Sequence, residues 1–301
     1  MPLLQSTAEA LSRESLERGV IEEILTKDDM FALMPFMGVS GKAYVYDREN
    51  SMSGADFLGP NETVNESAAD VTEVTAHLKI LIGDVDVDKF LDTTMNDTFD
   101  QTAVQIAAKA KGVRRLFQQC VISGDTTANA KQFDGLKRLC VPNQVITAGA
   151  NGAAISLSML DALRDQVILG PDAFIMRRGT WRAIKSLMRA SGGTRADMLQ
   201  MENFGWSTPS VDGVPIILND FIPMNETVGN NAATTSIYAV RFNEADGVHG
   251  IYGGSSAGMV VENIGTVQNK DANRIRVKWY AGMCLKATHA LARLSGVNAN
   301  G

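Results

Sequence analysis

The chain has 301 residues, 45% of them hydrophobic and 21% charged, which is typical of a globular protein with a sizeable core. Its 28 basic and 34 acidic residues give a formal net charge of -6, so no overall basic field draws the chain onto nucleic acid or an anionic membrane. No apolar run approaches the roughly 18 residues of a membrane span, and the first residues lack the pattern of a signal peptide, so we expect neither membrane insertion nor signal-dependent export.

Residues 1–40 are predicted to form an N-terminal arm. Between Ser6 and Leu33, apolar side chains recur in helical register among many glutamates and arginines, which is typical of an amphipathic helix. Pro35 disfavours continuation of that helix through the next apolar run. An arm that buries only one stripe needs a partner surface, either on its own body or on a neighbouring subunit.

Residues 41–90 are predicted to form an extended, two-stranded excursion. Alternating side chains from Gly41 to Arg48 indicate one strand, and a polar stretch, 49–69, interrupts it. From Asp70 the chain returns extended, with two predicted apolar sets: Leu78, Ile80 and Ile82, and then Val85 and Val87 opposite Asp84, Asp86 and Asp88. An isolated hairpin is marginal in water, so we expect another element, most naturally a neighbouring subunit, to support it.

A helix over residues 96–122 is the longest predicted element, roughly 40 Å at 1.5 Å per residue. Its apolar residues alternate in spacings of four and three, which keeps them on one helical face: Phe99, Ala103, Ile106, Ala110, Val113, Phe117 and Cys120. The other face carries Lys109, Lys111, Arg114 and Gln118. Asn96 or Thr98 would cap the start of the helix, and Gly124 would end it in the left-handed conformation.

From about Ala148 the pattern becomes α/β. We predict helices over 156–169 and 180–190, buried strands over 173–176 and 214–218, and a loop over 191–210. Further strands are predicted over 237–242, 248–252 and 259–262, and a final extended run over 274–292. In that run Ile275, Val277, Trp279 and Ala281 face one way, and Arg274, Arg276, Lys278 and Tyr280 face the other.

Residues with chemical potential are scattered and form no catalytic constellation. Gly254–Gly258 matches the G-x-S-x-G motif of hydrolases, but a strand-like run follows where that motif needs a helix, so we predict a turn. His77, His249 and His289 lack metal-ligand spacing, and Asp84, Asp86 and Asp88 lack the rest of a calcium loop, which favours a solvated face over a divalent ion. Cys120, Cys140 and Cys284 are predicted to be buried free thiols. We therefore predict a non-enzymatic protein without a catalytic, cofactor or metal site.

The order of the elements resembles the Hong Kong 97-type major capsid protein of tailed bacteriophages over nearly the whole chain. The most specific match is Ile122–Asp125 followed by Phe133–Leu136, which resembles the family's turn after its spine helix. Gly213–Ile217, with Asn219, Asp220 and Pro223 behind it, is similar to a strand of the family's axial domain, and Arg274 to Ala292 to its last peripheral strand.

The resemblance implies an α+β capsid fold with four parts. They are an arm (1–40), an extended loop (41–90), a peripheral domain (91–147 and 246–301) built on a spine helix (96–122), and an axial domain (148–245). It also implies a structural protein that assembles in the host bacterial cytoplasm into the hexamers and pentamers of an icosahedral virion shell around double-stranded DNA. Scaffolding, portal and decoration proteins are the implied further partners. DNA contact would be weak and non-specific, through Lys109, Lys111, Arg114 and Arg115 on the spine.

The chain departs from parts of the family pattern. Some members carry a scaffold-like domain before the arm, and this sequence resembles those with a separate scaffold or none. Others join subunits by a Lys to Asn isopeptide bond, but the loop offers Lys42 and Lys79 while its tip has Asn61 and Asn65 and no lysine, so we predict no covalent cross-link. The alternative within the same fold is an encapsulin-like shell that encloses a cargo enzyme instead of DNA; a tail or other virion component ranks third, and an enzyme of unknown class last.

Overall fold

The computed structural model describes residues 29–51, 53–60, 62–63, 66, 68, 70–89, 101–190, 198–200, 207–254 and 258–298. Its helices in these ranges are α2 (Asp29–Leu33), α4 (Gln101–Ser123), α5 (Leu136–Leu139), α6 (Leu157–Asp165) and α7 (Arg178–Ala190), with short 3-10 turns η1 (Pro142–Gln144) and η2 (Thr288–Ala290). The strands are β1 (Phe36–Val39), β2 (Ala43–Ser51), β3 (Asp70–His77), β4 (Lys79–Asp88), β5 (Val145–Thr147), β6 (Ala173–Met176), β7 (Met198–Gln200), β8 (Ser207–Val211), β9 (Val214–Leu218), β10 (Glu226–Val228), β11 (Asn231–Val240), β12 (Val248–Gly253), β13 (Val260–Thr266), β14 (Ala272–Leu285) and β15 (Leu291–Asn298).

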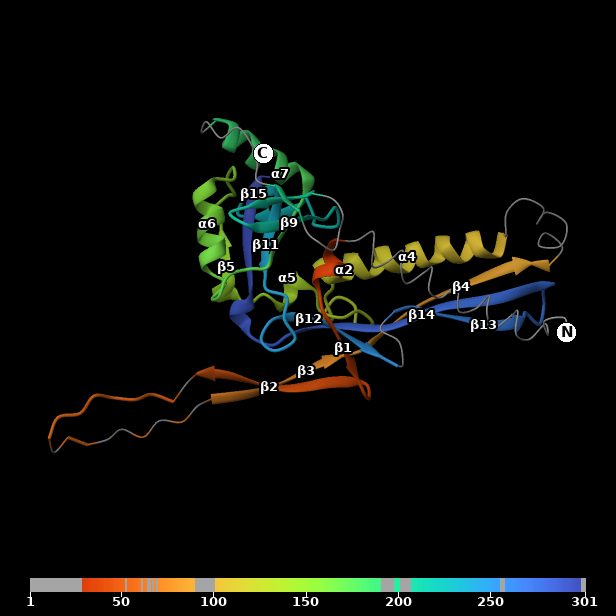
Figure 1. The fold of residues 1–301 in the computed structure, drawn as a ribbon, viewed down its shortest axis with the longest axis horizontal. Coiled ribbons are helices and arrows are strands. Elements are labelled where there is room, and N and C mark those ends of the chain that lie inside the picture. The colour runs from red at the N-terminus through yellow and green to blue at the C-terminus, as the bar shows by residue number, and fades with distance from the viewer. Residues whose placement is uncertain are drawn as a thin grey trace.

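The first sheet has five strands in the order β1-β12-β14-β13, with β4 paired along β14. Helix α4 lies over its long end, where β4, β13 and β14 run side by side (Figure 1). The predicted spine is confirmed from Gln101 to Ser123, and its stripe from Ile106 to Cys120 is buried against this sheet. The expected N-cap residues Asn96 and Thr98, and Phe99, lie outside the described residues.

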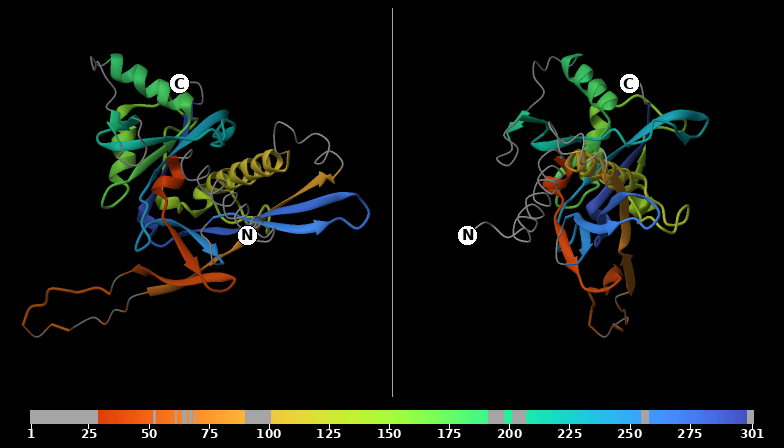
Figure 2. Two further views of the ribbon diagram at one scale, coloured as in Figure 1. Left: turned by 45° about the vertical axis from the view of Figure 1, so that its right-hand side comes forward. Right: turned by 90° about the vertical axis from the view of Figure 1, so that its right-hand side faces the viewer.

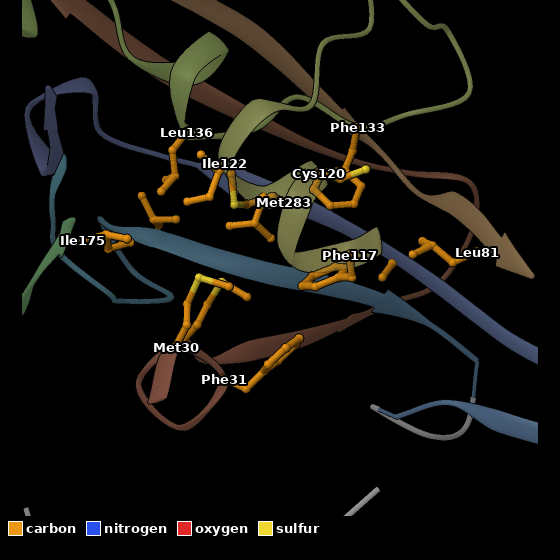
Figure 3. Close-up of a cluster of buried hydrophobic side chains, with 14 of the residues drawn as sticks. Met30, Phe31, Leu81, Phe117, Cys120, Ile122, Phe133, Leu136, Ile175 and Met283 are labelled. Atoms are coloured by element: carbon orange, nitrogen blue, oxygen red, sulfur yellow. The ribbon is translucent and has the colours of Figure 1, made fainter. Parts of the chain in front are cut away.

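Phe117 of α4 occupies the middle of this core. Its ring centroid lies 4.4 Å from that of Trp279 on β14 and 5.3 Å from those of Phe31 and Phe133. Figure 3 shows Met30 and Phe31 of α2 reaching the same cluster from the opposite side to Phe133. The last turn of the predicted arm helix is therefore docked in the core, and the helix ends at Leu33 before Pro35 as expected; residues 6–28 lie outside the described part of the chain.

A crowded turn joins α4 to α5. The amide of Gly124 donates to the carbonyl of Cys120 at 2.8 Å, and the amide of Gly135 donates to the carbonyl of Gly124 at 2.9 Å. The expectation of a left-handed Gly124 is wrong, because its φ is not among the positive ones. Glycine is required there for space instead: a Cβ on Gly124 would lie 2.3 Å from the Phe133 carbonyl oxygen.

Strand β4 corrects the predicted excursion. The hairpin is confirmed between β2 and β3, but after His77 the chain joins the first sheet, where β4 pairs with β14 over its whole length. The predicted apolar face is also shifted by one residue: Leu81 is buried, whereas Ile80 and Ile82 are 67% and 51% exposed. Successive residues of a strand point to opposite faces, so alternation alone does not say which face is buried. On β4 the buried face is the one that carries Leu81 and packs under α4.

The second sheet has eight strands in the order β5-β15-β11-β6-β9-β8-β7, with β10 paired to β11. Strands β6 and β9 have the predicted bounds and are buried, and α6 and α7 supply the predicted inward residues Leu160, Leu163, Trp181 and Ile184. Ser156 caps α6 by accepting a hydrogen bond from the Met159 amide at 3.3 Å. Together these elements enclose a second core.

Two predictions for the C-terminal half differ from the structure. The extended run 274–292 divides at η2, and β15, within the range predicted as peripheral, pairs with β5 and β11 of the second sheet. The predicted loop 191–210 contains β7 and most of β8, which pair with each other; its remaining residues lie outside the described ones. Both errors concern which strands pair with each other, and the local spacing of apolar residues does not predict this.

An ionic cluster around the buried Glu226 carboxylate ties α5 to the second sheet. The Glu226 carboxylate on β10 lies 2.9 Å from the Lys137 ammonium and 2.9 Å from the Arg293 guanidinium, and accepts a hydrogen bond from Ser236. Burial raises the pKa of Glu226, but the Ser236 hydroxyl and the two cations outweigh it, so the net pKa lies below its ordinary value of 4.5. The carboxylate is therefore charged in the folded protein at neutral pH.

We expect Glu226→Gln to lower the free energy of unfolding at pH 7 by roughly 2 kcal/mol, because it leaves two cations facing a neutral amide. Because the folded pKa is the lower one, the unfolded chain binds more protons below about pH 4.5, and the contribution of Glu226 is lost as pH falls through that window. Denaturant titrations at pH 7 and pH 3.5 check this. A variant that differs from the parent equally at both pH values would contradict the assignment.

Candidate intersubunit surface

The hairpin β2–β3 is a two-stranded sheet with one face toward the body of the protein. Tyr44, Tyr46 and Arg48 are partly buried, while Val45 and Asp47 between them are exposed, which confirms the predicted alternation. The ring of Tyr44 lies edge-on to buried His249, with 6.3 Å between ring centroids, and the Lys286 ammonium lies 5.4 Å from the Tyr44 ring. The base of the hairpin is thus packed against β12 and the end of β14.

Tyr46 and Arg48 hold the hairpin to the backbone of the first sheet. The Tyr46 hydroxyl donates to the carbonyl oxygen of Leu285 at 2.6 Å, and Arg48 Nε donates to the carbonyl oxygen of Lys286 at 2.8 Å. Arg48 Nη2 donates to the Leu285 carbonyl and, at 3.1 Å, to the Tyr46 oxygen. Burial raises the pKa of Tyr46 far above its ordinary value, so the hydroxyl remains a donor at every physiological pH.

Tyr46→Phe should loosen this attachment, because it removes one donor and leaves the Leu285 carbonyl with the Arg48 bond alone. We expect a loss of about 1 kcal/mol in the free energy of unfolding and faster hydrogen exchange at the amides of β2 and β3. Val45→Thr, on the exposed face of the same strand, is the control and should leave both unchanged. Equal exchange rates in the Tyr46 variant and the parent would show that the hydroxyl does not anchor the hairpin.

Beyond Ser51 the hairpin continues as a long tip that points away from the body in every view (Figures 1 and 2). Phe57 is fully exposed and Leu58 is 43% exposed. A local turn follows them, in which the Gly59 amide donates to the Glu62 carboxylate at 2.7 Å. Neighbouring apolar side chains displayed on a projecting segment indicate a partner surface that is not part of the same chain.

The exposed face of the first sheet carries a ladder of ion pairs. Arg274 donates two hydrogen bonds to the Asp86 carboxylate, and Arg276 donates two to Asp84, of 2.7 and 2.8 Å in each pair. Lys278 Nζ lies 2.6 Å from the Glu262 carboxylate. The hydrogen bonds from the arginines lower the pKa values of both aspartates. The face is solvated, as predicted, but its carboxylates are matched by cations; no cluster of metal-ligating residues is found within the described residues.

The other residues singled out by sequence are dispersed. His249 is buried, and burial lowers its pKa, so it is neutral at pH 7; His77 is exposed on the hairpin. The G-x-S-x-G motif stands between β12 and β13 with no helix after it, and its Ser256 lies outside the described residues. The three cysteines are buried and free, as predicted.

The cations predicted to contact DNA from the spine helix lie in different environments. The stem of Lys109 lies against Gly83 of β4, where a Cβ would come within 2.8 Å of it, while Arg115 lies over the ring of Phe221 at 5.3 Å. Lys111 is exposed. Among the lysines considered for cross-linking, Lys79 donates to the Ala130 carbonyl at 2.6 Å, and Asn61 and Asn65 lie outside the described residues.

Sequence reasoning missed the two features that define this surface. The anchoring role of Tyr46 and Arg48 could not be read from alternation, because the carbonyls that they bind belong to Leu285 and Lys286, more than two hundred positions away. The exposed pair Phe57 and Leu58 did carry a signal: two large apolar residues in an otherwise polar loop.

Comparison with known proteins gives matches among solved structures, whereas no family model and no curated protein matches the chain. The holo-SrpI encapsulin complex from Synechococcus elongatus PCC 7942 matches with a TM-score of 0.73 and 20% identity, over 92% of this chain and 90% of that one. A chain of Microbacterium phage Oxtober96 matches with a TM-score of 0.64 and 14% identity over 89% and 90%, and the capsid of the native GTA particle with 0.63 and 16% over 88% and 89%.

The chain has the Hong Kong 97-type capsid fold. The resemblance predicted from the order of its elements, and the α+β class, are thereby confirmed. Helix α4 and the β2–β3 hairpin are the elements that the resemblance assigns to the spine helix and the extended loop. No helix among the described residues is long and apolar enough to cross a membrane.

Proposed function

We propose that this chain is the major protein of a closed, self-assembled shell. The observation that carries the proposal is the hairpin: it is anchored at its base by Tyr46 and Arg48, and the exposed Phe57 and Leu58 on its projecting tip are not covered by the described body. A two-stranded ribbon of this kind is marginal in water, so a neighbouring copy is the natural cover. The solved structures of the same fold are those of an encapsulin complex and of capsids, which supports the same conclusion.

In the proposed shell, the axial domain, which is 148–245 together with β15 of the second sheet, meets its copies around the centre of a hexamer or pentamer. The β2–β3 hairpin and its tip lie over a neighbour's peripheral domain, which contains the spine helix and the first sheet, and the arm (1–40) adds a further contact. Each contact is weak on its own, but contacts repeated around a closed lattice act as linked valencies. Stability of the shell then exceeds that of any single interface.

We propose that the shell is a virion capsid and encloses the double-stranded DNA genome of a tailed phage, with assembly in the host cytoplasm. The capsids of the native GTA particle and of Myoviridae phage XM1 among the structural matches support a capsid. Cations on α4, Lys111 above all, would make the weak, non-specific contact that lets DNA slide during filling. Scaffolding, portal and decoration proteins would be the accessory partners, and no catalysis by the chain is needed.

An encapsulin-like shell around a cargo enzyme is the second candidate. It is favoured by one observation: the match to the SrpI encapsulin complex has a TM-score of 0.73, against 0.64 for the phage chain. The two candidates share the shell and differ in what it holds. They are therefore separable by the contents of the particle alone.

Particles isolated from the native source and treated with nuclease on the outside test the content. A phage capsid should retain DNA that becomes sensitive to DNase, and not to RNase, only after the shell is opened. A cargo shell should instead retain a second protein in fixed ratio and no protected DNA. The second result would overturn the genome proposal while leaving the shell proposal intact.

A further inference from the structure

We propose that Phe57 and Leu58 at the hairpin tip of one copy insert into an apolar pocket at the hairpin base of a second copy. The inference rests on the proposed shell function and assigns the residues that join one subunit to the next. It follows from four observations: the shape of the pocket, its charge, the geometry of the tip, and the distance between the two.

The receiving pocket has a volume of about 890 Å³ and lies where the hairpin leaves the body. Its apolar lining comes from Val39, Leu78, Ile80 and Tyr280. Ile80 and Tyr280 face each other across β4 and β14 and are 67% and 38% exposed, although they are large apolar or aromatic side chains. The pocket can therefore hold a phenylalanine and a leucine and would bury apolar surface of its own when it does.

Charge favours the hairpin tip as the occupant. Between residues 49 and 78 the chain has no lysine or arginine, and its ionisable side chains other than His77 are acidic: Glu49, Asp56, Glu62, Glu66, Asp70 and Glu73. The pocket has Lys42, Lys79 and His77 in its lining and no acidic residue. Acidic residues on both sides of the Phe57–Leu58 pair would thus meet a basic rim, and such complementarity sets the register of an interface.

The tip is built to present its apolar pair. Pro60 follows Gly59 in a turn whose ends are joined by the Glu62 amide to the Gly59 carbonyl at 3.3 Å and by the Glu62 carboxylate to the Gly59 amide at 2.7 Å. A turn fixed before binding reduces the entropy lost on docking. Aromatic side chains that enter a pocket and are ringed by polar contacts are the usual anchors of protein interfaces.

A tip cannot reach the pocket of its own chain. Lys42 of the pocket directly precedes β2 and Ser51 is its last residue, so at about 3.3 Å per residue the strand separates the pocket from the start of the tip by roughly 30 Å. The donor and receiver are thus different surfaces, and the contact is head-to-tail. Such contacts generate rings when the rotation closes, which is the symmetry that hexamers and pentamers need.

Disulfide trapping in assembled shells tests the inference. Phe57→Cys with Ile80→Cys in one chain should, on mild oxidation, give covalent ladders that end at the size of a capsomer ring. Val71→Cys with Ile80→Cys is the matched control, because Val71 is also exposed but lies on the stem. Phe57→Cys with Ser186→Cys tests a cavity elsewhere on the body, of about 410 Å³ beside α7, with Leu187, Arg182 and Arg189 in its lining. The native cysteines are buried and do not compete.

Ladders from the Phe57/Ile80 pair alone support the inference. Shells whose Phe57/Ile80 pair does not cross-link, or cross-links no better than the stem control, overturn it, as do shells that trap Phe57 at Ser186; in these cases the shell proposal stands. If the unmodified chain forms no shells, the shell proposal fails and the inference fails with it.

Charge reversal gives a second, independent readout. Asp56→Lys should raise the protein concentration needed for assembly by about tenfold, and adding Lys42→Glu should restore most of the loss. Rescue requires that the two side chains meet across the interface. Additive losses in the double variant would contradict the docking, provided that each variant unfolds at the parent's temperature.

Discussion

Gly135→Ala is expected to lower the free energy of unfolding by on the order of 3 kcal/mol or more. A Cβ at this position would lie 2.4 Å from the Cys120 carbonyl oxygen, 2.7 Å from the Gly124 amide nitrogen and 2.8 Å from the Val121 carbonyl oxygen. All three atoms belong to the backbone, so no side chain can rotate away to make room. The end of the spine helix or the start of α5 would have to move, and both help to enclose the first core. Denaturant titration of the unassembled chain measures the loss.

Gly112→Ala, inside α4, is the matched glycine control. A Cβ there meets nothing within 4 Å, and alanine favours the helix over glycine, so this variant should be more stable than the parent by about 0.5–1 kcal/mol. Similar free energies of unfolding for the Gly135 and Gly112 variants would mean that the turn between α4 and α5 tolerates side chains. The packing described for Gly124 and Gly135 would then be wrong.

Shortening the hairpin is expected to abolish assembly while the subunit stays folded. Ser51 is paired with Asp70, so residues 52–69 can be replaced by Asn-Gly, a pair suited to a two-residue turn. The anchors Tyr46 and Arg48 remain, and the free energy of unfolding should change by less than about 1 kcal/mol. Loss of the tip removes the proposed contact from every subunit of a ring at once, so the effect on assembly is multiplied around the lattice.

Light scattering after gel filtration, with thermal unfolding on the same fractions, checks this result. The parent and the Gly112→Ala variant should elute as large particles, and the shortened chain should elute as a folded monomer. Normal particles from the shortened chain would contradict the role given to the tip. An unfolded variant is distinguished from this outcome by its missing thermal transition.

Local patterns predicted those elements whose faces are fixed by their nearest neighbours. The four-and-three spacing of the spine identified the buried stripe through Phe117, and alternation identified the inward set of β14 from Ile275 to Ala281. Strands β6 and β9 were found with correct bounds because they are short, continuously apolar and bounded by turns. In each case apolar residues either recur at the spacing of a helix or a strand, or form a short continuous run.

The errors came where the decision belongs to a distant segment. Strand β4 was assigned to the hairpin because it is extended and follows β3 directly, yet ten positions of β14 pair with it, and α4 determines that Leu81 and not Ile80 is buried. Likewise β15 continues the extended run after β14 but enters the other sheet through η2. When both faces of a strand carry apolar residues, its own sequence does not predict which other strand it pairs with.

The sequence predicted that a projecting loop exists, but it did not predict which residues anchor that loop to the body. A polar excursion between two strands indicated a projecting loop that needs a partner, and the structure describes such a hairpin. The residues that fix its angle, Tyr46 and Arg48, could not be found, because their acceptors are carbonyls and every residue has one. A contact between two side chains requires particular residue types at both positions, whereas a hydrogen bond to a backbone carbonyl requires a particular residue type only at the donor position.

Electron microscopy of the purified full chain tests the central claim most directly. If projecting hairpins are covered by neighbouring copies, the protein should form closed, isometric shells of uniform diameter with hexamers and pentamers in the wall. A chain that stays a dispersed, folded monomer at every concentration would contradict the account, because the hairpin tip would then be stable without a partner.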